Sequence, residues 1–278
     1  RTSHSPRGPL LLVLLRLEDG RRLIWSATLN RNTLRINSES VRLQDEQIFA
    51  TSSSSFNLLG QKHEITHDYT GSLLASLKDS LLSPELKTLR DTIRNIRSLE
   101  LLSPHLLRKR SRAQDKDIGA GGEKLSGFLA TLKGEQKAQL LAVLRQFYPQ
   151  LRDFRVAKVR GGWWRLLVTE AVQSATDPTQ KVLLETEASQ LNDGLLRILA
   201  MLAQANSQRS GMLLLDEVEN GINPEIVEKL VNALLNSPVQ VLVTSHSPMI
   251  LNYLDDDVAR KAVQFVYKNP RGQTRVRP

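Results

Sequence analysis

The feature that most constrains this chain is a short apolar run that ends in two carboxylates. Residues 212–215 are all apolar, and Asp216 and Glu217 follow directly. An apolar run without alternation is typical of a strand that is buried on both faces, as in a parallel sheet covered by helices. Ligands of such sheets bind beyond the carboxyl ends of the strands. Adjacent acids there suit a divalent metal and a general base, and the alternative is a strand that ends in two solvated acids.

A second apolar segment predicts a strand that carries a histidine to its end. Residues 239–248 are VQVLVTSHSP, so Thr244, Ser245 and His246 follow the apolar part. If this strand is buried beside residues 212–216, His246 faces the same crevice as Asp216 and Glu217. A lone histidine is more often structural, but a histidine opposite an acidic pair is typical of a catalytic crevice.

A third segment, LNDGLLRIL, places Asn192, Asp193 and Gly194 at the start of a helix predicted over 193–206. Glycine lets a backbone approach a ligand closely, and a helix start offers free N–H groups to a phosphate. Taken alone, the segment is a capped helix start.

The order of elements indicates an α/β protein. Residues 10–50 predict an antiparallel meander with a turn at Asp19-Gly20, and residues 72–112 and 123–147 are helical in pattern. Strands and helices then alternate to residue 254, which predicts a mainly parallel sheet. We expect three parts: 1–70, an antiparallel β-subdomain; 71–150, a helical insertion; and 151–278, the core.

Basic residues recur at helical spacing beside the apolar face of the segment 72–112. Lys/Arg rows neutralise phosphates, so a nucleic-acid or partner surface is one interpretation, and a solvated helix face is the other. The residues concerned are a stripe, Lys87, Arg90, Arg94 and Arg97, and a cluster, Arg108, Lys109 and Arg110.

Composition limits the class of protein. The formal charge of +9 and the pI of about 9.9 favour polyanionic partners, whereas 5% aromatic residues argue against stacking platforms for single strands. The chain has no cysteine, which fits a cytoplasmic location. No apolar stretch approaches 18 residues, so we expect no membrane span.

Three motifs together resemble a known family, the ABC-type ATPases of the RecF, SMC and OLD group, which include AAA-type ATPases of bacterial DNA repair and anti-phage defence. LNDGLLRILAML resembles the signature motif, LLLDEVENGINPE the Walker B motif with the D-loop, and VLVTSHSP the switch histidine. The resemblance implies a P-loop NTPase fold of the ABC-ATPase kind, with a mainly parallel core sheet, an antiparallel β-subdomain and a helical insertion.

The resemblance also implies roles for single residues. Asp216 would bind Mg²⁺, Glu217 would activate the attacking water, and His246 would sense the γ-phosphate of ATP. Asn223 would lie in the D-loop. Two heads would enclose two nucleotides as a homodimer or higher homo-oligomer.

In such a dimer the signature motif of one head completes the site of the other, so Asn192, Asp193 and Gly194 would bind ATP in trans. The family commonly has serine where this chain has Asn192. An amide can still donate a hydrogen bond there.

The phosphate loop GxxxxGK[ST] is not present in the chain. The nearest match, GAGGEKLS at 119–126, has Glu123 between Gly122 and Lys124 and no predicted strand before it. Because the chain opens without Met, we expect the phosphate loop to lie upstream. The alternative is a degenerate head that does not hydrolyse ATP.

The leading hypothesis is an ATPase head that dimerises around ATP and drives or gates an effector protein, in DNA repair or anti-phage defence. One alternative is a scaffold that binds ATP, assembles and holds an effector without hydrolysis. Another is a nucleic-acid-binding module, for DNA or RNA, that uses the basic residues. No interaction with a membrane is expected.

Overall fold

The computed structural model describes residues 10–30, 36–52, 54–69, 71–112, 116–177, 179–207 and 211–277. The chain forms two compact units, Arg1–Arg94 and Asn95–Pro278. Each unit has its own cluster of buried apolar side chains. The division differs from the boundaries at 70 and 150 that the sequence suggested, because residues 71–94 pack with the first unit.

The first unit is built on a six-stranded antiparallel sheet in which sequence neighbours pair. The predicted turn at Asp19-Gly20 joins β1 to β2, where Arg16 pairs with Arg22 and Gly20 has a φ of +85°. The antiparallel meander is therefore confirmed. Its strands are β1 (Leu10–Arg16), β2 (Arg22–Leu29), β3 (Ile36–Leu43), β4 (Glu46–Thr51), β5 (Ser55–Leu58) and β6 (Gln61–Glu64).

Short helices share the apolar core of this sheet. They are α1 (Leu73–Ser76), the 3-10 helix η1 (Asp79–Leu81) and α2 (Pro84–Arg94). Leu73, Leu86 and Leu89 are fully buried in one cluster with Leu23 and Phe49 of the strands. Period-3 and period-4 spacing thus predicted the buried face of α2 correctly.

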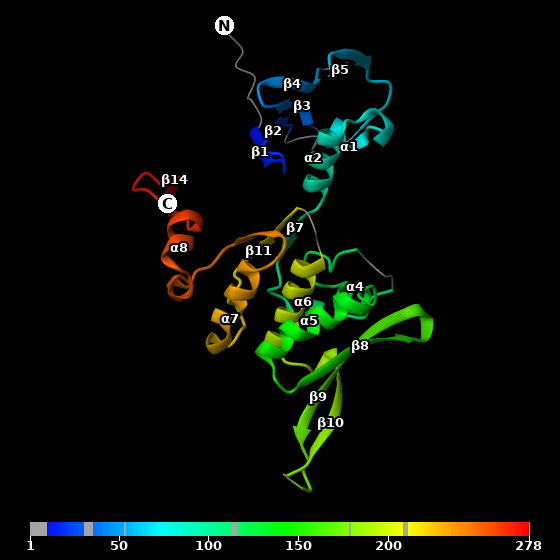
Figure 1. Ribbon diagram of the computed structural model, residues 1–278, viewed down its shortest axis with the longest axis vertical. Coiled ribbons are helices and arrows are strands. Elements are labelled where there is room, and N and C mark those ends of the chain that lie inside the picture. Colours follow the sequence, from blue (N-terminus) through cyan, green and yellow to red (C-terminus); the bar gives the residue numbers. More distant parts are fainter. Residues whose placement is uncertain are drawn as a thin grey trace. The chain divides into compact units, whose positions relative to one another are not determined.

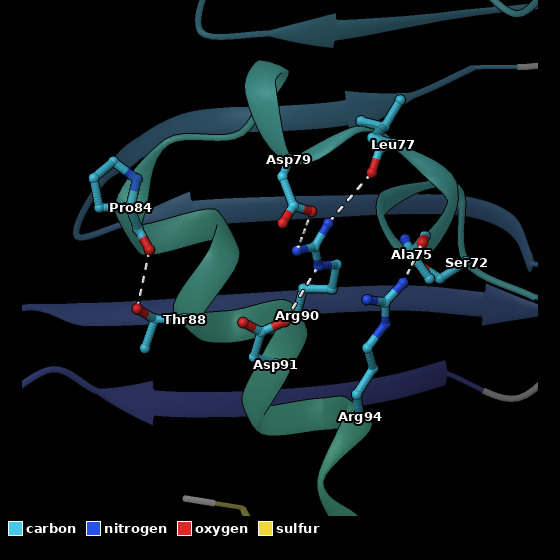
Figure 2. A network of polar contacts seen from close by, with 9 residues as sticks. All are labelled: Ser72, Ala75, Leu77, Asp79, Pro84, Thr88, Arg90, Asp91 and Arg94. Carbon is cyan, nitrogen blue, oxygen red and sulfur yellow. Dashed lines mark hydrogen bonds and ion pairs between the residues drawn. The ribbon is translucent and has the colours of Figure 1, made fainter.

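The predicted basic stripe does not form one helix face, so this part of the prediction is wrong. Helix α2 ends at Arg94, and Arg97 lies in a strand of the other unit. Arg90 is only 5% exposed, because its guanidinium donates to Asp79 at 2.7 Å and to the carbonyl of Leu77 at 3.3 Å. Figure 2 shows this network, in which Arg94 donates to the carbonyl of Ala75. The side chains of Arg90 and Arg94 are thus hydrogen-bonded to backbone carbonyl groups of their own unit.

The second unit contains a parallel sheet in the order β12-β11-β7. Its strands are β7 (Ile96–Leu99), β11 (Met212–Leu215) and β12 (Gln240–Val243). Leu213 pairs with Val241 on one side and with Arg97 on the other. The parallel pairing of β11 and β12 is confirmed. The prediction that residues 72–112 are helical is wrong for β7, because residues 96–99 form a strand that pairs with β11.

Strand β12 is less buried than its sequence suggested. It lies at an edge of the three-stranded sheet of the described residues, and Leu242 is 53% exposed. Strand β11, in the centre, has Leu213 and Leu215 almost fully buried.

Two antiparallel elements complete the strands of the second unit. A hairpin at Gly161-Gly162 joins β8 (Leu151–Val159) to β9 (Trp163–Gln173), and β10 (Lys181–Glu187) pairs with β9. A hairpin joins β13 (Phe265–Lys268) to β14 (Thr274–Arg277).

The helices of this unit are α3 (Pro104–Leu107), α4 (Leu125–Leu129), α5 (Gly134–Phe147), α6 (Asp193–Ser207), α7 (Pro224–Leu235) and α8 (Asp256–Ala262), with the 3-10 helices η2 (Arg160–Gly162), η3 (Ala188–Gln190) and η4 (Pro248–Tyr253). Helix α6 is central, since residues 194–205 are all buried and it packs against α3, α5, α7 and β11 (Figure 1). In the described part of the chain, no helix is both long and apolar enough to cross a membrane. The α/β class is confirmed.

Candidate functional site

The candidate site lies at the carboxyl ends of β11 and β12. Backbone hydrogen bonds between these two segments continue past the ends of the strands. The N–H of Thr244 donates to Leu215 O at 2.9 Å, and the N–H of Val218 donates to Thr244 O at 3.3 Å. Asp216 and Glu217 therefore leave β11 beside Thr244, as expected for neighbouring parallel strands.

One hydroxyl group links the two acids. The Oγ1 of Thr244 donates to Oδ1 of Asp216 and accepts from the backbone N–H of Glu217 at 3.0 Å. The acid pair is thus oriented by the neighbouring strand end, while the Asp216 side chain stays exposed to solvent.

His246 lies beside the acid pair. The distance between Nε2 of His246 and Oε1 of Glu217 is 3.5 Å, a contact that becomes an ion pair when the imidazole is protonated. The other oxygen of Glu217 accepts from Nδ2 of Asn220 at 3.1 Å. The His246 side chain is 86% exposed, so it is open to a ligand. The predicted meeting of an acid pair and an imidazole at two strand ends is therefore present in the structure.

Glu217 adopts a backbone conformation that is rare for a residue with a side chain. Its φ is +47°, in the left-handed region. Such conformations cost roughly 1–3 kcal/mol and concentrate at functional sites. The strain is held by hydrogen bonds at both ends of the residue, from Glu217 N–H to Thr244 and from Asn220 N–H to Glu217 O at 2.9 Å.

A third acid, Glu219, holds the histidine loop. Its Oε1 accepts from the backbone N–H of His246 at 3.1 Å and of Ser247 at 3.2 Å. Its Oε2 is buried and has no hydrogen-bond partner in the described residues. Sequence reasoning missed Glu219 and Asn220, although both lie within four residues of the acid pair.

Asn192, Asp193 and Gly194 form the first turn of α6. The Oδ1 of Asn192 accepts from the N–H of Gly194 at 2.8 Å and of Leu195 at 3.3 Å, so the amide caps the helix. A Cβ at Gly194 would lie 3.3 Å from the carbonyl of Gly221, which explains the glycine. Among the described residues, no hydrogen bond or ion pair joins this turn to the acid pair or the histidine.

Asn223 caps α7 in the same way. Its side chain accepts from the N–H of Glu225 at 3.1 Å, and Pro224 occupies the first helical position, where no N–H is needed. The residue is exposed at the end of the loop that follows the acid pair.

The basic cluster near residue 110 is partly engaged within its own unit. Arg108 donates to Asp193 and to the carbonyl of Leu191, the latter at 2.8 Å. Arg110 pairs with Glu187 at 2.9 Å, whereas Lys109 is exposed. Arg108 therefore braces the turn at the start of α6.

The segment that resembled a phosphate loop has a different structure. None of the strands in the described ranges leads directly into it, and Oε2 of Glu123 accepts from the N–H of Gly121 at 3.0 Å. A Cβ at Gly119 would meet the same carboxylate at 2.4 Å. Because a carboxylate of the chain already fills the turn, residues 119–126 do not form a phosphate site.

The donor set at the strand ends fits Mg²⁺. Asp216 and Glu217 offer hard oxygen ligands and line a small pocket together with Leu215, Asn220 and Arg197, while the Thr244 hydroxyl binds the Asp216 carboxylate. Across the described ranges, no group of three or more His, Cys, Asp or Glu side chains could hold a metal alone. Mg²⁺ is commonly bound by one or two carboxylates together with substrate phosphates, so an incomplete cage is compatible with it.

Comparison with known proteins places the chain in a family. Residues 73–252, more than half of the chain, match the family described as "AAA domain, putative AbiEii toxin, Type IV TA system". The chain belongs to this AAA family. No curated protein matches it.

Among solved structures, one SMC head shows the same fold as this chain. A crystal structure of an SMC head bound to the C-winged helix domain of ScpA has a TM-score of 0.54 and 11% sequence identity, and the match covers 96% of this chain and 72% of that chain. The SMC head domain from Thermotoga maritima has a TM-score of 0.46 and 9% identity, with 97% and 73% covered. The chain thus shares the fold of an SMC head domain.

Proposed function

We propose that this protein hydrolyses ATP with Mg²⁺ at the ends of β11 and β12. The observation that carries the proposal is the convergence of Glu217, His246 and the Asp216–Thr244 pair at neighbouring strand ends. Asp216 would hold Mg²⁺, which supplies charge neutralisation at the phosphates when bound. Glu217 would accept a proton from the attacking water, and His246 would donate a hydrogen bond to the γ-phosphate.

Positioning and charge stabilisation provide most of the rate in phosphoryl transfer. The left-handed backbone of Glu217 and its contacts with Asn220 and His246 support a base that is oriented before substrate arrives. Asn192, Asp193, Gly194 and Asn223 are proposed to contact the nucleotide of a second head. This proposal draws on the exposed positions of Asn192 and Asn223 at helix starts.

We further propose that ATP-dependent dimerisation of heads drives an effector protein. Two findings support a partner and a defence role: an SMC head of similar fold is bound to a domain of ScpA, and the family description includes a type IV toxin–antitoxin system. DNA repair is the second setting that the resemblance suggests.

The decisive experiment replaces Glu217 by Gln in the intact protein and measures phosphate release and ATP binding separately. We expect turnover to fall by about 10²–10⁴-fold with ATP affinity retained, because the amide cannot accept the proton. Glu228→Gln, on the exposed side of α7, is the matched control and should leave turnover unchanged. An equally active Glu217→Gln variant would exclude Glu217 as the base.

The same assay separates hydrolysis from the scaffold alternative. A scaffold would bind ATP and assemble, but the wild-type protein would release almost no phosphate even with its effector and DNA present.

A further inference from the structure

Arg197 is a buried cation on the helix that starts with the Asn192–Gly194 turn. Its side chain is 6% exposed, one turn after Gly194 on α6. The Nη1 group donates to the carbonyl of Asn220, and Nη2 donates to the carbonyl of Leu102 at 3.2 Å. Arg197 therefore connects α6 to the loop that follows the acid pair.

Burial of the Arg197 guanidinium is expected to reduce the stability of the fold. In the described residues Arg197 forms no ion pair, and its Nε is buried without a hydrogen-bond partner. Burial lowers the pKa of Arg197, and the nearby charge of Asp193 opposes that shift only in part. A buried charge that lacks a carboxylate partner is commonly less stabilising than an apolar side chain of similar volume. Packing therefore does not explain why position 197 is an arginine.

The loop is shaped to receive the guanidinium. Gly221 has a φ of +67°, and a Cβ there would lie only 3.0 Å from Cζ of Arg197, so the guanidinium packs against bare backbone. The carbonyl of Gly221 in turn lies 3.3 Å from the place of a Cβ at Gly194. The first turn of α6 is therefore in close contact with the loop, and the guanidinium of Arg197 lies against the same loop.

The loop begins at Glu217 and is hydrogen-bonded back to it. Asn220, whose carbonyl Arg197 holds, donates from Nδ2 to Oε2 of Glu217 at 3.1 Å and from its N–H to Glu217 O at 2.9 Å. A displacement of α6 would move the Asn220 amide that binds the Glu217 carboxylate. The route runs through the side chain of Arg197, the backbone and side-chain amide of Asn220, and the carboxylate of Glu217.

We propose that Arg197 is a positioning residue that transmits engagement of the Asn192–Gly194 turn to Glu217 of the same head. The inference rests on the proposed function, because the turn is engaged by the nucleotide of a second head. Binding of the turn to that nucleotide thereby aligns the base of its own site. Hydrolysis at one site becomes dependent on occupancy of the other.

The test compares Arg197→Met, which keeps length and loses the donors, with Arg197→Lys, which keeps the charge. Ile198→Val is the control, since Ile198 is fully buried on the same helix and its truncation destabilises the fold without removing a hydrogen bond. Amide hydrogen exchange of residues 216–221 is measured in the intact protein, first without nucleotide and then with a non-hydrolysable ATP analogue.

Without nucleotide, we expect exchange at 216–221 to be about tenfold faster in Arg197→Met, from the loss of a charged hydrogen bond, with partial recovery in Arg197→Lys. The analogue should slow exchange at 216–221 in the wild type, whereas in Arg197→Met it should protect residues 192–196 only. Turnover of Arg197→Met should fall about 10²-fold with KM changed less than about twofold, because the base is misplaced and ATP still binds.

The inference would be overturned if residues 216–221 exchanged amide hydrogens at the same rate in Arg197→Met as in the wild type. Equal acceleration in Ile198→Val at the same melting temperature would also overturn it, because the effect would then be general loosening of the fold. If the wild-type protein binds the analogue but does not hydrolyse ATP, the proposed function fails, and exchange with the analogue still decides whether Arg197 transmits engagement.

Discussion

The Thr244 hydroxyl makes the most direct test of the geometry at the strand ends. It donates to the Asp216 carboxylate and accepts from the N–H of Glu217, so Thr244→Val removes two hydrogen bonds while keeping the shape of the side chain. A bond to a charged group contributes about 1.5–3 kcal/mol and a neutral bond about 1 kcal/mol. Because Thr244 is exposed, water compensates for much of the loss of these two hydrogen bonds. We therefore expect the free energy of unfolding to fall by about 1–2 kcal/mol.

For a unit of this size, 1 kcal/mol corresponds to roughly 2–4 °C, so the melting temperature should fall by about 2–8 °C. Thermal unfolding of Thr244→Val is compared with Thr244→Ser, which keeps the hydroxyl and loses the methyl group. Turnover should fall about tenfold or more in Thr244→Val alone, because the backbone of Glu217 loses its anchor. If the Val variant were as stable and active as the Ser variant, the hydroxyl would not organise the acid pair.

Two further predictions concern neighbouring parts of the second unit. Burial, followed by the charge of Glu170, raises the pKa of Tyr148 to about 12, so its contribution to stability is complete below pH 10 and is lost as pH rises toward 12. Unfolding titrations should show that the wild type loses about 1 kcal/mol more than Tyr148→Phe over that range, after discounting for partial exposure; parallel curves would contradict this. Because Glu217 has a φ of +47°, Glu217→Gly should be about 1 kcal/mol more stable than Glu217→Ala by denaturant unfolding, and a more stable Ala variant would refute the left-handed backbone.

The sequence predicted the centre of the site because its signals are local. An apolar run with two acids behind it, and a second run with His246 behind it, define two strand ends. The pairing of β11 with β12 then brings those ends together without further information. Asn192 was placed at a helix start for the same reason, since a capping residue stands directly before its helix, whereas Asn223 was suggested only by the resemblance to a D-loop.

Other features depend on contacts between distant parts of the chain. Strand β7 carries one arginine among four residues and forms because β11 offers it an edge, so its own pattern did not distinguish it from helix. The spacing of Arg90 was that of an exposed stripe, yet the residue is buried by acceptors at Leu77 and Asp79. Arg197 lies in an apolar helix pattern, and its contact with the carbonyl of Asn220 depends on a residue 23 positions away.

The acids of the loop have different roles, which determines how their substitutions should be interpreted. Asp216 and Glu217 present oxygens to the pocket, whereas Glu219 directs one oxygen to the backbone of His246 and Ser247. Loss of activity on changing Glu219 would therefore report displacement of the histidine loop, not loss of a metal ligand or base. Since the carboxylate anchors two N–H groups, such a change should also lower the protection of residues 246–247 from hydrogen exchange, and a change at Asp216 should not. Activity alone cannot separate the two roles, but exchange at the histidine loop does.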